Sequence, residues 1–161
     1  MSQTEELIKA VSEFLKESHY QYVWREKTVV ELTFFFPVKV LGKTISMKEF
    51  VFIGDRDIRV IGVMPFSVPA DKRDLAAEYL MRVNYWLQTG WFSMCYDDGE
   101  VRASAERSQF IGVPSAKDLN QLIMTPVTII SNFAGGLILT IRDYATPKEN
   151  AEKYTPDVMK E

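Results

Sequence analysis

The side chains with the most chemical potential in this sequence are one histidine, one cysteine and two short acidic groups. His19 lies at a predicted helix-to-strand junction, and as a general base it would need a nucleophile or a carboxylate from elsewhere in the fold. Cys95 has no basic neighbour in sequence that would activate its thiol, which favours a small packed side chain over a nucleophile. Neither residue by itself indicates catalysis.

The acidic groups are typical of tight turns. Asp55 with Asp57, and Asp97 with Asp98 and Glu100, each accompany a glycine, where aspartate commonly bonds to the turn backbone. Neither group has the spacing of a calcium loop, and the sequence contains no phosphate loop, dinucleotide fingerprint or nucleophile elbow. We therefore expect no enzymatic activity, no metal site and no cofactor.

Composition sets the class of protein. The chain has 161 residues, 47% of them hydrophobic, which is enough for one domain with its own core. A single cysteine excludes an intramolecular disulfide, and the acidic, amphipathic N-terminus lacks the pattern of a signal peptide, so we expect a cytoplasmic protein. A net charge of −3 without a cluster of Lys and Arg argues against a nucleic-acid partner.

Residues 29–64 alternate as a three-stranded antiparallel meander, and both faces of this meander are apolar. The face predicted to form the core carries Val30, Leu32, Phe34, Phe36, Val38 and Val40 in its first strand. One core needs only one apolar face, so the second face needs another explanation.

Two turns decide which side chains of the second face are neighbours. We interpret residues 42–43 as a two-residue hairpin loop, which places Phe35 opposite Phe50. A tight turn at residues 54–57 places Phe50 opposite Ile61. The two registers therefore predict one aromatic and aliphatic row across three strands.

The same registers extend this row into a candidate protein-binding surface. Phe52 faces Arg59, within reach of a cation–π contact, and Val63 faces Lys48. The predicted surface comprises Phe35, Phe50, Phe52, Arg59, Ile61 and Val63. Two interpretations stay open: a helix, the tail or a dimer partner covers it permanently, or it binds a client polypeptide.

Glu49 conflicts with this pattern. The registers point it toward the core, opposite Phe36 and Gly62. A bulge near Pro37 would turn it outward.

Helices are expected on either side of the meander. Ser2 and Glu5 form a capping-box pattern before a short amphipathic helix, and Asp71 is a candidate N-cap for a second helix that Gly90 closes. Residues 98–99 are an Asp-Gly hairpin signal. They predict a hairpin whose core-facing side chains are Phe92, Met94, Tyr96, Val101, Ala103 and Ala105.

A third helix is expected from Ser115, whose hydroxyl can cap it and whose partner Asp118 stands at the capping-box position. Pro126 should kink this helix, and the glycines 135–136 should weaken or end it. Residues 119–141 contain no charged side chain, but their polar positions recur at helical spacing, so we expect an amphipathic helix and no membrane span. The uncharged polar side of this helix and one asparagine of the second helix are candidate dimer contacts: Asn84, Gln121, Thr125, Thr128 and Asn132.

The expected fold class is α+β in a single domain, ordered as helix, three-stranded antiparallel meander, helix, β-hairpin and helix. We place this domain at residues 1–142. Residues 143–161 are polar, contain two prolines and lack a consistent face, so we expect a mobile tail there.

A resemblance adds to these expectations. Asn84, the strand start at 90–92, the acidic-Gly hairpin at 98–99 and Arg102 on the following strand resemble the pattern of the YbjN-like family. That resemblance implies a type III secretion chaperone-like fold, the role of a bacterial sensory-transduction regulator, no assigned enzymatic activity and a homodimer that handles other polypeptides.

These observations lead to two hypotheses. The first is a non-enzymatic, chaperone-like or regulatory homodimer that contacts a polypeptide client through the apolar sheet face. The alternative is a small-ligand-binding protein or an enzyme that uses His19 and Arg102 with the acidic turns. A buried Arg102 would favour anion binding, whereas an exposed one would favour cross-strand pairing.

Overall fold

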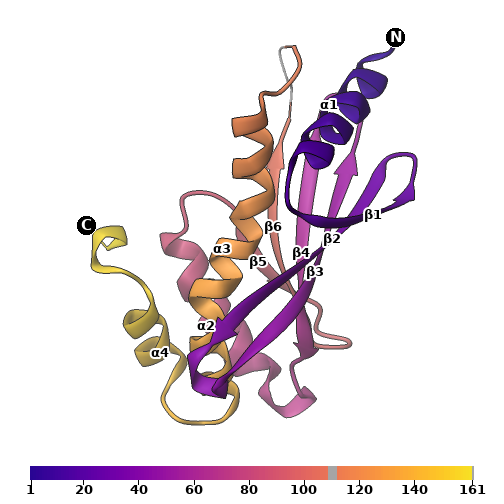
Figure 1. Cartoon of the computed structure of the whole chain (residues 1–161). Coiled ribbons are helices and arrows are strands. Elements are labelled where there is room, and N and C mark those ends of the chain that lie inside the picture. Colours follow the sequence, from indigo (N-terminus) through magenta and orange to yellow (C-terminus); the bar gives the residue numbers. More distant parts are fainter. Residues whose placement is uncertain (109–111, 161) are drawn as a thin grey trace.

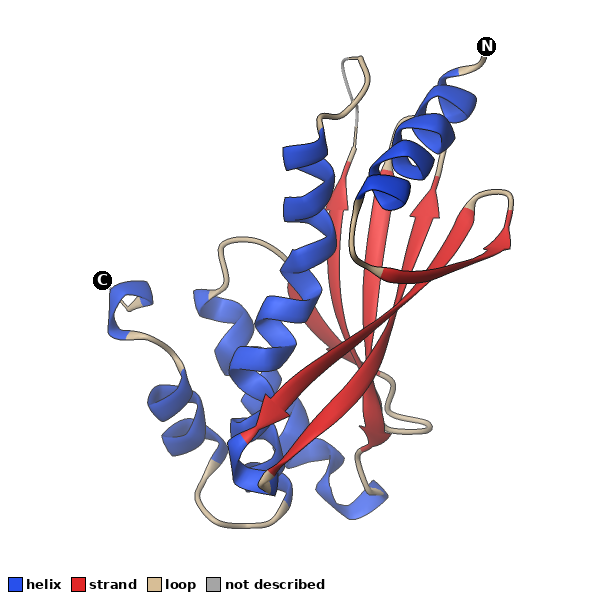
Figure 2. Cartoon of the chain, in the orientation of Figure 1, coloured by secondary structure: helices blue, strands red, loops and turns tan. Residues whose placement is uncertain are grey.

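Within residues 1–108 and 112–160, which the computed structural model describes, six antiparallel strands form one sheet and four α-helices lie on one side of it (Figures 1 and 2). The strands are β1 (Gln21–Glu26), β2 (Val29–Val38), β3 (Lys43–Ile53), β4 (Ile58–Ser67), β5 (Trp91–Met94) and β6 (Glu100–Arg107). The helices are α1 (Gln3–Glu17), α2 (Arg73–Trp86), α3 (Ala116–Ile141) and α4 (Pro147–Tyr154), with short 3₁₀ turns at η1 (Lys39–Leu41), η2 (Ala70–Lys72) and η3 (Asp157–Met159). The predicted α+β class is confirmed.

The sheet has the strand order β1-β2-β3-β4-β6-β5. β1 pairs with β2 and makes the meander four-stranded, which corrects the expected three. β6 pairs with β4, so the β5–β6 hairpin extends the same sheet.

The capping boxes at the starts of α1 and α3 are confirmed. In α1 the Ser2 hydroxyl accepts from the Glu5 N–H at 3.2 Å, and the Ser2 N–H donates to the Glu5 carboxylate at 2.8 Å. Ser115 and Asp118 repeat the arrangement in α3. For α2 the predicted cap is wrong, because Asp71 lies inside η2 and Lys72 occupies the cap position without a side-chain bond.

The β3–β4 register is confirmed because a tight turn fixes it locally. The Gly54 N–H donates to the Asp57 carbonyl at 2.9 Å. Phe50 therefore pairs with Ile61, and Phe52 pairs with Arg59.

The predicted β2–β3 register is wrong by four residues. The chain turns through η1 and through Gly42, whose φ is +63°, so Val38 pairs with Lys43. The longer loop lets Val40 and Leu41 pack against the core, an apolar gain that a two-residue hairpin would forgo. Because the shift is an even number of residues, every β2 side chain keeps its predicted face but changes its partner.

The β5–β6 hairpin is confirmed, and Gly99 takes the positive φ of +76° that its turn requires. Phe92 and the small residues of β6 are buried as predicted. Tyr96 is the exception, because β5 ends at Met94 and leaves its ring 55% exposed.

The helices cover one face of the sheet, which we call the inner face, with two apolar clusters. α1 and the first part of α3 pack over one end, where Leu32, Val51 and Val60 point inward. α2 and the rest of α3 pack over the other end, around Met47 and Met64, and α4 packs on the outer side of α2 and α3. On β3 and β4 one inward position, which we call the seam, separates the two clusters.

Glu49 lies in that seam. It points to the inner face, as the alternation predicts, and is 0% exposed. Its partners are Leu32, in place of the predicted Phe36, and Gly62. A Cβ on Gly62 would lie 3.2 Å from the Pro126 side chain, so α3 crosses directly over this position. The bulge that would have turned Glu49 outward is not formed.

The C-terminal segment is ordered, which corrects the expected mobile tail. A Thr146–Glu149 capping box starts α4, and Pro147 occupies its first turn. The glycines 135–136 continue α3 to Ile141 and leave room for the Tyr154 ring, which would lie 2.9 Å from a Cβ at either position. The two glycines and the C-terminal segment meet in one contact, that of the Tyr154 ring with α3. Neither the continued helix nor the docked segment could therefore be predicted from its local sequence alone.

Helix α3 is long and apolar enough to cross a membrane by length and composition, but most of its most apolar stretch is buried inside the fold.

Candidate functional site

The second face of the sheet, which we call the open face, carries the candidate site. None of the helices in the described ranges covers it, because α1 to α4 all pack on the inner face (Figures 1 and 2). Pairing of the six strands aligns one outward row: Val23, Glu31, Phe50, Ile61, Ser104 and Trp91. The row spans the full width of the sheet.

The centre of the open face is apolar. The Phe50 and Phe52 rings lie 6.4 Å apart, and Ile61 and Val63 stand beside them on β4. All four side chains are partly exposed. They line a hollow of about 600 Å³, with Arg102 at its border.

Arg59 lies over the edge of this centre. Its guanidinium carbon is 5.6 Å from the centroid of the Phe52 ring, which confirms the predicted cation–π contact. The arginine is itself exposed. The centre therefore presents an aromatic surface with a cation already placed on it.

Glu31 is a site residue that the sequence analysis missed. It occupies the position opposite Phe50 that was predicted for Phe35, and its side chain is only 9% exposed. It accepts from Arg25 Nε at 2.6 Å and from Lys48 Nζ. These two bonds, Arg25 first, lower the pKa of Glu31 to about 2. Only the correct β2–β3 register would have revealed this arrangement.

Phe35 lies outside the predicted row. It pairs with Ser46 near the end of β2 and is 62% exposed. The structure thus brings together five of the six predicted surface residues and separates the sixth.

The candidate dimer contacts lie on the helices. The Asn84 amide forms two bonds with the Phe92 backbone, donating to its carbonyl at 2.9 Å and accepting from its N–H at 2.7 Å. This side chain ties α2 to β5 within one chain, as its position near the Gly90 turn indicates. Gln121, Thr128 and Asn132 are exposed on α3, and the partly exposed Thr125 donates to the Gln121 carbonyl at 2.7 Å.

The residues of the alternative hypothesis do not converge. Arg102 is exposed at the border of the hollow and donates to Glu100 of the same strand at 2.5 Å, in place of the cross-strand pairing expected of an exposed arginine. His19 is exposed between α1 and β1. Among the residues that the structure describes, three or more metal-binding side chains nowhere gather into a group.

No family model matches the chain, and no curated protein matches it. The geometry of the open face is therefore the basis for assigning a function.

Proposed function

We propose that this protein is a non-enzymatic, chaperone-like or regulatory module that acts as a homodimer and binds an extended polypeptide segment on its open face. One observation carries the proposal: a sheet with all its helices on one side exposes Phe50, Phe52, Ile61 and Val63 together on the other. The resemblance of residues 84–102 to the YbjN-like family supports the homodimer and the handling of polypeptides.

The apolar centre supplies the driving force. Burying a fully exposed Phe, Ile or Val side chain contributes about 1.5 to 3 kcal/mol, and the four side chains that line this hollow are already partly buried, so each gains a fraction of that amount. A partner that fills the hollow gains these four apolar contributions before any polar contact forms.

The charges around the centre select the partner. Lys48, Arg59 and Arg102 surround the apolar side chains. Lys48 is paired with Glu31 and Arg102 with Glu100, so among the described residues Arg59, placed over the Phe52 ring, is the cation here without an ion pair. A segment that alternates apolar and acidic side chains fits this surface, because its apolar side fills the hollow and its carboxylates reach the cations.

The test uses a defined probe. A synthetic peptide that alternates leucine with glutamate is titrated into the ¹⁵N-labelled protein, and the same peptide with lysine is titrated in parallel. We expect amide shifts confined to β3, β4 and β6, with tighter binding of the acidic peptide. Equal binding of both peptides, or shifts elsewhere, would contradict the proposal.

Phe50→Asp is the decisive variant, and Phe35→Asp is its matched control on the same face outside the hollow. We expect Phe50→Asp to lose peptide binding while its unfolding midpoint and its sedimentation stay close to those of the control. If Phe50→Asp instead loses the dimer and much of its stability, the open face is a permanent interface between subunits, and the client hypothesis fails. Where Phe50→Asp keeps its stability and its dimer, a comparison of the proteins captured from the host by the wild type and by the variant names the client.

A further inference from the structure

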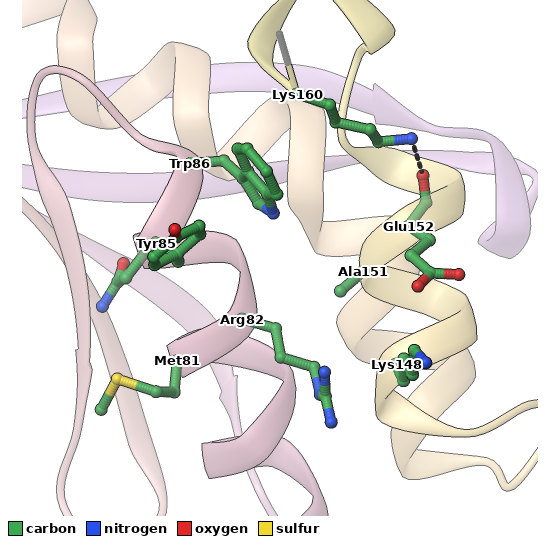
Figure 3. A pocket seen from close by; sticks show the side chains of 9 residues that line it. Met81, Arg82, Tyr85, Trp86, Lys148, Ala151, Glu152 and Lys160 are labelled. Atoms are coloured by element: carbon green, nitrogen blue, oxygen red, sulfur yellow. Dashed lines mark hydrogen bonds between the residues drawn. The ribbon is translucent and has the colours of Figure 1, made fainter.

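A second concave site lies on the helical side of the molecule, between α2 and α4 (Figure 3). This cleft measures about 830 Å³. Met81, Tyr85 and Trp86 reach it from α2, and Lys148 and Ala151 reach it from α4. Its size is that of small-molecule sites, which commonly span about 300 to 1,000 Å³.

The α2 wall of the cleft is apolar and aromatic. Tyr85 and Trp86 form an edge-to-face pair with ring centroids 4.9 Å apart. Tyr85 is 79% exposed and Met81 is 70% exposed, which is unusual for two large apolar side chains one turn apart on a helix. Figure 3 shows the Trp86 ring projecting from α2 toward α4.

Hydrogen-bond donors surround this wall. Within the described residues, Lys148 forms no ion pair and the Trp86 indole N–H forms no hydrogen bond. Arg82 pairs with Glu78 at 2.8 Å, but an exposed pair one helical turn apart is worth little and exchanges readily. Among the described residues that line the cleft, three are cations, Arg82, Lys148 and Lys160, and one is an acid, Glu152. Lys160 donates to the Glu152 carbonyl at 2.8 Å and to Asp157 at 3.2 Å, so Lys148 is the cation that a ligand meets without a competing partner.

From this combination we infer that the α2–α4 cleft binds an amphipathic anion: a small molecule whose apolar body packs on Trp86 and Tyr85 and whose carboxylate lies near Lys148. The apolar wall alone would bind any apolar molecule of suitable size. The unpaired ammonium and the unused indole donor select the anionic one. This site goes beyond the proposed function, because it lies on the opposite side of the sheet from the open face.

Decanoate below its micelle concentration is the probe, and decyltrimethylammonium is the control, with the same chain length and the opposite charge. We expect decanoate to shift amide signals of α2 and α4 in a saturable way and to leave those of β3 and β4 unchanged. The cationic control should bind at least about tenfold more weakly. Equal binding of the two amphiphiles, or shifts on the open face alone, would overturn the inference and leave the peptide experiment unaffected.

Lys148→Glu tests the cation directly. Lys148 is the second residue of α4, where a helix N-terminus favours glutamate, so the variant should fold. Lys117→Glu is the matched control, since Lys117 is the second residue of α3 and is exposed. We expect decanoate affinity to fall about tenfold or more in Lys148→Glu and to stay unchanged in Lys117→Glu. Equal affinity in both would refute the assignment of the site.

Trp86→Phe keeps an aromatic ring and removes the N–H donor together with part of the apolar surface of the indole. We expect a smaller loss of decanoate affinity, about three- to tenfold. Vesicles that contain phosphatidylglycerol test whether the anion is a membrane lipid. Vesicle binding without binding of monomeric decanoate would also overturn the inference.

Discussion

At the scale of single residues, the buried carboxyl group of Glu49 makes the stability of the fold depend on pH. It is fully buried, and neither carboxyl oxygen has a hydrogen-bond partner among the described residues. Burial away from water disfavours the ionised form and raises the pKa of Glu49 well above its ordinary value of 4.5. The folded protein therefore holds this proton at pH values where the unfolded chain has released it.

The raised pKa of Glu49 makes the folded protein less stable at higher pH. Between the ordinary pKa and the raised one, the folded state binds more protons, so stability falls as pH rises. We predict that Glu49→Gln, which cannot ionise, is more stable than the wild type at pH 8 by on the order of 2 kcal/mol and gains much less at pH 5. Urea unfolding at the two pH values measures this. Glu106→Gln, an exposed change, should shift neither; equal effects of both would contradict the burial argument.

Glu31 on the open face gives stability the opposite pH dependence at acid pH. Bonds from Arg25 and Lys48 lower the pKa of Glu31 to about 2, so the stability that they contribute is present above pH 4.5 and is lost as pH falls toward 2. We predict that Glu31→Gln flattens this acid limb. Unfolding midpoints followed between pH 5 and pH 2 should then converge with those of the wild type at the acid end, and a constant difference would contradict the ion-pair explanation.

At the scale of elements, contact between helices decides more than helix propensity does. Gly136 lies within α3, where alanine ordinarily stabilises a helix by about 1 kcal/mol. A Cβ there would collide with the Tyr79 hydroxyl and lie 2.9 Å from the Tyr154 ring. Tyr79 is buried, and its hydroxyl donates to the Phe133 carbonyl at 2.7 Å, so it cannot simply move aside.

We therefore predict that Gly136→Ala destabilises the protein by about 2 kcal/mol, against its helix propensity. The matched control is Asn132→Ala, one turn earlier on the exposed side of α3, which should stabilise by a few tenths of a kcal/mol. Thermal and urea unfolding of both variants measure the difference. An unchanged free energy of unfolding in Gly136→Ala would mean that α2 and α4 pack more loosely on α3 than the contacts indicate.

Elements fixed by local chemistry could be predicted from the sequence, and those fixed by distant contacts could not. The Ser2 and Ser115 caps and the Gly54 turn involve residues at most three apart, so their patterns suffice. The β2–β3 loop depends on whether Val40 and Leu41 pack against a core formed by later residues. That choice moved Phe35 out of the candidate site and brought Glu31 into it, while the β3–β4 half was predicted correctly.

At the scale of the whole molecule, the helices stand on one side of the sheet and the open face stands on the other (Figure 2). The segment expected to be a tail belongs to the helical side. Pro147, Asn150, Ala151 and Thr155 are buried there, and the Asn150 amide donates to the Thr140 hydroxyl at 3.0 Å. The domain therefore extends beyond residue 142.

Removing residues 143–161 tests this extension. We predict a loss of about 2 to 4 kcal/mol in the free energy of unfolding, because the truncation uncovers the α2 and α3 surfaces that α4 buries. Removal of residues 156–161 alone should cost much less, since α4 stays in place. Equal stability of the full chain and the 1–142 fragment would restore the tail interpretation.

Tyr154, the last residue of α4, fills the space beside two glycines of α3, and a linker of residues 142–146 joins the two helices. In thermodynamic terms α4 is a ligand tethered to its own receptor, and a short tether raises its effective concentration to about the millimolar range. Modest intrinsic affinity is then sufficient to keep it docked. Because α4 is also one wall of the cleft, an anion bound against Lys148 and the docking of α4 reinforce each other by the same factor.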